Sequence, residues 1–131
     1  MDGDTTEPRV LLVEPNAPLR SAVVAVLSAE QYRVQICGCL QDVLAHTDGL
    51  APTVALVAWQ SMEGLLAEEH RHALVELTRQ VRLVLMVPRH WAKLLEQTDV
   101  ASTVAGIVTK PFLAEELLRV LQQALLVPVD A

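Results

Sequence analysis

The sequence predicts an α/β fold in which helices cover both faces of a parallel β-sheet. Short apolar segments that favour strands alternate five times with segments that favour helices along the 131 residues. The third apolar segment, residues 52–60, contains no charged residue and is bounded by turn signals, which is typical of a strand buried on both faces. Because open parallel sheets bind ligands at the carboxyl ends of their strands, we expect functional residues there.

The first strand and helix are predicted within residues 9–30. The run from Val10 to Val13 is apolar, and Pro18 follows at a position that the first turn of a helix tolerates. We expect a strand over 9–13 and then a helix with Asn16 or Ala17 near its N-cap. The residues expected to face the sheet recur at helical spacing and are Leu19, Val23, Val26 and Leu27.

The middle of the chain continues the alternation. Residues 32–37 are rich in strand formers and end at Gly38, and residues 40–46 favour a short helix. After the central strand, apolar residues at helical spacing predict an amphipathic helix over residues 62–80 with a charged, solvated face.

The last third supplies two more units. Residues 83–87 favour a strand that we expect Pro88 to end, and residues 104–109 favour the fifth strand. Between them, residues 90–98 favour a helix whose inward residues are expected to be Trp91, Leu94 and Leu95. The final helix, residues 112–126, carries an apolar stripe made of Leu113, Leu117, Val120, Leu121 and Ala124.

Composition and charge narrow the functional classes. A hydrophobic content of 52% is ample for one core, and we expect a domain over 9–126, a polar extension over 1–8 and a tail over 127–131. The net charge of −6 disfavours direct binding to nucleic acid or to an anionic membrane. No apolar run reaches the length of a membrane span, so we expect a cytoplasmic protein. Cys37 and Cys39 are too close for an easy disulfide and are expected to be reduced thiols.

Two short motifs add a resemblance to this pattern. Val13-Glu14-Pro15-Asn16 follows the first strand, and Thr109-Lys110-Pro111-Phe112 follows the fifth. Together with the order of elements, they resemble the receiver domain of bacterial response regulators over about residues 9–126. The resemblance implies a flavodoxin-like (βα)5 three-layer sandwich with a five-stranded parallel sheet of order 2-1-3-4-5. It also implies phosphorylation by a sensor histidine kinase on an aspartate at the end of the third strand.

The positions that the resemblance assigns to the phosphoryl site carry mostly other residue types. The acceptor falls on Ala58, the acidic pair on Glu14 and Pro15, the hydroxyl on Val87, the aromatic switch on Ile107 and the lysine on Lys110. A methyl group is no nucleophile, and one carboxylate leaves magnesium too few oxygen ligands. We therefore expect no catalytic residue, no metal site and no cofactor.

Neighbouring residues do not restore the site. A shift of one residue would place Trp59 at the acceptor, and there is no aspartate between Gly49 and Gln97. We expect Lys110 to pair with Glu14 across the crevice rather than to bind an anion, and Trp59 to cover the uncharged pocket. Pro111 is a candidate for a cis peptide, as the resemblance implies.

The sequence thus favours a pseudo-receiver, a phosphorylation-independent signalling module of a bacterial two-component system that acts through protein interaction. The alternative is a regulatory domain that binds a small molecule or an anion in the crevice near Glu14, Trp59, Val87 and Lys110. An enzyme is the weakest hypothesis, because no acid-base pair or activated nucleophile is apparent. His70 and His72 lie two residues apart, so they would point to different sides of a helix and form no metal site.

The resemblance also implies a contact surface for a protein partner or a homodimer, made of the fourth helix, the fifth strand and the fifth helix. Leu118 and Leu125 are expected at the rim of the last helix's apolar stripe, with Leu126 on its far side. The interface candidates combine apolar centres with a charged border and are Trp91, Lys93, Leu118, Arg119 and Leu125.

Overall fold

The computed structural model describes residues 8–45, 53–58, 77–97 and 100–126. In chain order its elements are β1 (Arg9–Val13), α1 (Ala17–Ala29), β2 (Arg33–Ile36), α2 (Leu40–Ala45), β3 (Thr53–Ala58), β4 (Arg82–Pro88), α5 (Arg89–Glu96), α6 (Val100–Thr103), β5 (Gly106–Lys110) and α7 (Ala114–Leu125). Residues 77–80 are also helical and belong to the helix predicted over 62–80. The rest of that helix and Trp59 lie outside the described residues.

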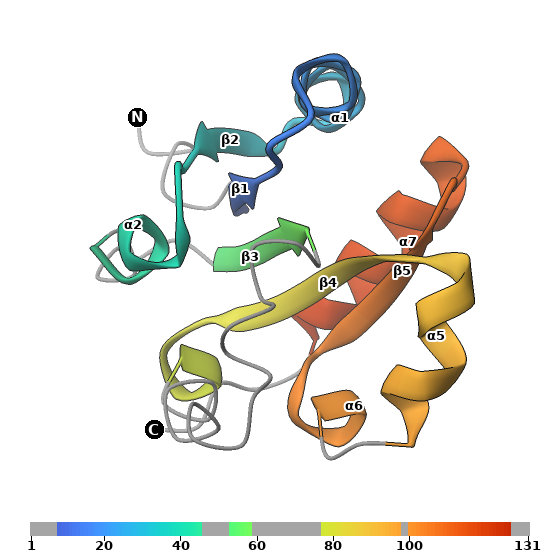
Figure 1. The fold of residues 1–131 in the computed structure, drawn as a ribbon. Helices are drawn as coiled ribbons and strands as arrows, with labels where there is room; N and C mark the ends of the chain where they lie inside the picture. Colours follow the sequence, from blue (N-terminus) through green and yellow to red (C-terminus); the bar gives the residue numbers. More distant parts are fainter. Residues whose placement is uncertain (1–7, 46–52, 59–76, 98–99, 127–131) are drawn as a thin grey trace.

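The five strands form one parallel sheet in the order β2-β1-β3-β4-β5 (Figure 1). Every adjacent pair is parallel, and β3 lies at the centre with Val57 in register with Val13 of β1 and with Leu85 of β4. All six residues of β3 are buried, as its uninterrupted apolar sequence predicted. The fold class and the strand order implied by the resemblance are therefore confirmed.

Successive residues of the central strands enter two different cores, because side chains alternate across a sheet. In one core, alternate strand residues pack against α2, the helical residues 77–80 and α5. These three segments contribute Val43, Leu77 and Leu95 to this core. The second core packs the intervening strand residues against α1 and α7, which contribute Val23, Leu27, Leu117, Leu121 and Ala124. The molecule is thus a three-layer sandwich with a sheet in the middle (Figure 1).

The starts of α1 and α7 fix the loops that follow β1 and β5. Asn16 is the N-cap of α1, and its side-chain oxygen accepts a hydrogen bond of 2.9 Å from the Leu19 N–H. Before α7, the Glu116 carboxylate accepts a hydrogen bond of 2.8 Å from the Leu113 N–H. Both loops lie at the carboxyl ends of the strands, so these caps position the residues of the candidate site.

The structure corrects two residues that were predicted to face inward. Trp91 is exposed at 38%, because α5 turns Ala92 and Leu95 toward the core and leaves the indole beside the His90 ring, 5.8 Å between centroids. Leu113 is exposed at 65%, because it is the extended N-cap residue of α7 and lies outside the helical stripe. In contrast, Leu126 lies on the far side of the stripe as predicted and is exposed at 83%.

Some boundaries also differ from the predictions. β4 includes Pro88 instead of ending before it, and β5 begins at Gly106 and includes Lys110. The short helix α6 precedes β5 and was not predicted. Within the described residues, no helix has the length and apolar character required to cross a bilayer.

Candidate functional site at the carboxyl ends of the strands

Glu14 is the charged group at the centre of the candidate site. It follows β1 directly, and its side chain is fully buried. Its Oε1 lies 2.7 Å from the Nζ of Lys110, the last residue of β5, and its Oε2 accepts a hydrogen bond of 2.9 Å from the Asn16 N–H. The predicted pairing of Lys110 with Glu14 is confirmed.

This ion pair links two strands that do not touch each other. β1 and β5 are separated in the sheet by β3 and β4, and Glu14 and Lys110 bridge them above the strand ends. Arg20 of α1 adds a hydrogen bond of 3.1 Å from its Nη1 to the Glu14 backbone carbonyl. Both carboxylate oxygens therefore have protein donors, and a cation would have to displace them to bind.

Ala58 is the last residue of β3 and lies between the strands that carry Glu14 and Lys110. It is fully buried, contributes to the core beneath α1 and α7, and is in register with Met86 of β4. Its side chain offers only a methyl group at the point where open parallel sheets place their ligand chemistry. Its side chain therefore supplies neither a nucleophile nor a metal ligand.

β4 ends one residue later than predicted, at Pro88, which bears on the site. Val87 is fully buried in the core against α2 and α5 and is not among the described residues that line the cavity. The next residue, Pro88, is in register with Lys110 and lines a cavity beside it. Because neighbouring residues of a strand face opposite sides, the residue that meets the crevice here is Pro88, which has no hydroxyl group.

The two remaining positions of the implied phosphoryl site do not join the ion pair. Pro15 is exposed between β1 and α1. Ile107 is partly buried and packs against the same core as Val87. Within the described ranges, no group of three or more metal-ligating side chains is present.

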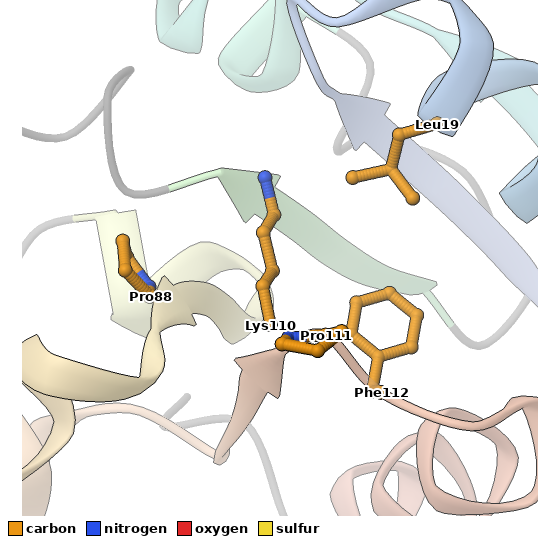
Figure 2. A pocket seen from close by; sticks show the side chains of 5 residues that line it. All are labelled: Leu19, Pro88, Lys110, Pro111 and Phe112. Atoms are coloured by element: carbon orange, nitrogen blue, oxygen red, sulfur yellow. The ribbon is translucent and has the colours of Figure 1, made fainter.

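A cavity of about 350 Å³ opens next to the ion pair (Figure 2). It is lined by Leu19, Pro88, Lys110, Pro111 and Phe112, and the Lys110–Pro111 peptide is cis as anticipated. Figure 2 shows the Lys110 side chain extending between Pro88 on one side and Leu19 and Phe112 on the other. The sequence pattern assigned Leu19 to the core and Pro88 to a strand end, so it gave no signal that both line a cavity.

The interface candidates fall into two groups. Trp91, Lys93 and Arg119 are exposed on α5 and α7. Leu118 and Leu125 are half-buried and pack against the core beneath α7, so they lie at its margin.

The cysteine pair is outside this site. Cys37 is buried and Cys39 is exposed, and both are free thiols as predicted. Burial raises the pKa of the Cys37 thiol, and the nearby Asp42 and Cys39 raise it further. A thiol with a raised pKa holds little thiolate at neutral pH, which makes Cys37 a weak nucleophile.

No family model matches the chain, and no curated protein matches it in sequence. Solved structures do match. The signal receiver domain of a two-component response regulator from Bacteroides fragilis has a TM-score of 0.71 and 20% identity. The match covers 94% of this chain and 100% of that domain. The non-phosphorylated HemR receiver domain from Leptospira biflexa has a TM-score of 0.70 and 17% identity over 93% of this chain and 97% of its own.

A receiver domain protein from Methanospirillum hungatei JF-1 has a TM-score of 0.66 and 15% identity, covering 92% of this chain and 94% of its own. At these identities the likeness establishes the fold, which is that of response regulator receiver domains.

Proposed function

We propose that this chain is a phosphorylation-independent receiver-like module of a bacterial two-component, or phosphorelay, system. It acts in the cytoplasm through protein–protein interaction, not as an enzyme, and does not itself bind nucleic acid. The observation that carries the proposal is Ala58 at the carboxyl end of β3, fully buried and without an ionisable group. The fold shared with receiver domains supports the signalling role.

The Glu14–Lys110 pair supports a domain with one resting arrangement of its strand ends. In a receiver that takes up phosphate, the resemblance implies that the acidic residues after β1 bind a metal and that the lysine after the fifth strand belongs to the same site. Here the Glu14 carboxylate accepts hydrogen bonds from both the Lys110 ammonium group and the Asn16 N–H. The side chain of its neighbour Pro15 has no oxygen that could bind a metal. Glu14 and Lys110, the charged groups that a phosphoryl site would use, are paired with each other. Partner binding therefore does not depend on a bound phosphoryl group or metal.

The absence of phosphoryl transfer is the first test of this function. Incubated with acetyl phosphate and magnesium, the protein is expected to keep its mass, because no described residue at the strand ends offers a carboxylate free for attack. Intact mass spectrometry measures this, with a phosphorylatable receiver domain treated in parallel as the positive control. A mass increase of one phosphoryl group that hydroxylamine removes would contradict the proposal.

We further propose that the partner, or a second copy of the chain, binds the surface of α5, β5 and α7. Trp91 supplies exposed apolar area there, and Lys93 and Arg119 are exposed charged residues on the same two helices. Leu113, at the start of α7, adds a second exposed apolar side chain. Aromatic residues bordered by charges are typical of the anatomy of protein interfaces.

A dimer through this surface would bury about 1,000 Å² or more in total. We expect the molar mass from light scattering to rise toward that of a dimer with concentration and Trp91→Glu to shift it back to the monomer. Ile36→Glu is the matched control, because Ile36 is also exposed but lies on β2, at the opposite edge of the sheet. Equal molar masses for the protein and both variants at every concentration would exclude self-association through Trp91.

A further inference from the structure

The cavity beside the ion pair has the size and lining of a small-molecule site. Its volume of about 350 Å³ falls at the lower end of the range of about 300–1,000 Å³ for such sites. Its described walls come from three separate parts of the fold: Leu19 of α1, Pro88 of β4, and the segment from Lys110 at the end of β5 to Phe112. This site goes beyond the proposed function, since it requires neither a phosphoryl group nor a protein partner.

The walls are apolar and conformationally restricted. Leu19, Pro88, Pro111 and Phe112 present hydrocarbon, and two of the four are prolines, whose backbone φ angle is fixed. Leu19 and Phe112 also pack against the core beneath α1 and α7, which holds both side chains in place. A ligand would therefore meet a largely preformed surface and lose little free energy to reorganisation.

Among the described residues of the lining, Lys110 is the one that can ionise, and its charge is already balanced. Its Nζ lies 2.7 Å from Oε1 of Glu14, whose side chain is fully buried. An anion that drew Lys110 away would leave the Glu14 carboxylate buried without its counter-charge, which is costly. A cation would find the carboxylate already occupied by Lys110 and the Asn16 N–H. The cavity therefore disfavours charged ligands of either sign.

The ammonium group nevertheless has donors to offer. It carries three N–H groups, and in the described part of the chain its hydrogen bond goes to Glu14 alone. A carbonyl or hydroxyl oxygen on a ligand can accept from Lys110 without breaking the ion pair. The Phe112 ring and the Leu19 side chain supply apolar contact for the hydrocarbon part of the same ligand.

We propose that this cavity binds an uncharged, mainly apolar small molecule that carries one oxygen acceptor directed at Lys110. The ring or branched hydrocarbon of the ligand packs between Leu19, Phe112 and the two prolines. Its binding leaves the Glu14–Lys110 pair intact.

Three probes of the same shape and different charge test this assignment: naphthylmethanol, naphthoate and naphthylmethylammonium. Each is titrated into the isotope-labelled 131-residue chain and followed by amide NMR. We expect the neutral alcohol to shift the amide signals of Leu19, Lys110 and Phe112. We also expect it to bind about tenfold more tightly than either charged probe, because those must lose hydration without gaining a counter-charge.

Two substitutions locate the binding. Leu19→Asp places a carboxylate in the cavity wall and should abolish the shifts caused by naphthylmethanol, whereas Leu126→Asp changes an exposed leucine outside the lining and should leave them unchanged. The charge series on the unaltered protein keeps the test decisive if Leu19→Asp fails to fold. Tightest binding by naphthoate would assign an anion site and overturn the proposal. So would the absence of shifts up to the solubility limit of naphthylmethanol, or equal shifts in both variants.

Discussion

Lys110→Met is expected to lower the free energy of unfolding by about 3 kcal/mol, because it removes the counter-charge of a buried carboxylate. Methionine keeps most of the apolar stem that lines the cavity, so the loss isolates the charge. Among its described partners, Glu14 would retain only the Asn16 N–H on one oxygen and would lose the 2.7 Å contact on the other. Urea unfolding followed by circular dichroism measures the difference.

A double-mutant cycle separates the ion pair from its surroundings. Glu14→Gln removes the buried charge while keeping an amide oxygen for the Asn16 N–H, so Lys110→Met should cost far less in the Glu14→Gln background. We expect a coupling energy of at least about 1 kcal/mol between the two positions. Lys93→Met on the exposed face of α5 is the matched control and should change stability by less than about 0.5 kcal/mol. If Lys110→Met destabilises the protein no more than Lys93→Met, Glu14 does not depend on its partner.

The Glu14–Lys110 pair shows which features of the site can be predicted from the sequence. The alternation of apolar and amphipathic segments predicts the layers, and parallel strands bring all carboxyl ends to one edge of the sheet. Glu14 and Lys110 follow the first and fifth strands, so a contact across the edge could be anticipated before any coordinates. Their proximity depends on topology, which tolerates boundary errors of a residue or two.

Contacts that depend on the direction of one side chain were harder to predict. The sequence assigned Val87 to the crevice, whereas the residue of β4 that lines the cavity is Pro88, and a shift of one residue in a strand exchanges the two faces. Trp91 shows the equivalent effect on a helix, since its direction follows from where α5 begins. Leu113 continues the apolar spacing of α7 in sequence, yet it is the extended N-cap residue and points away from the core. These differences come from element ends, where spacing carries little information.

Gly106, the first residue of β5, provides the second large effect and was not singled out by its sequence. A Cβ built on Gly106 would lie 2.8 Å from Cγ1 of Val120 on α7, too close for two carbon atoms, and 3.7 Å from Cγ2 of Val84. Its backbone φ is not positive, so glycine is needed there for space and not for conformation. Val120 is β-branched and sits in a helix, where its χ1 angle has little freedom to move away.

We therefore expect Gly106→Ala to destabilise the fold by about 1–3 kcal/mol through overpacking between β5 and α7. The sign is informative, because alanine in place of glycine within a strand is otherwise stabilising by about 0.5–1 kcal/mol. Val120→Ala removes the opposing methyl groups, so in that background Gly106→Ala should be neutral or stabilising. The four proteins of this cycle are compared by urea unfolding. Equal or greater stability of Gly106→Ala alone would mean that α7 can move off the sheet at little cost, and that the close packing of β5 against α7 does not constrain this edge of the domain.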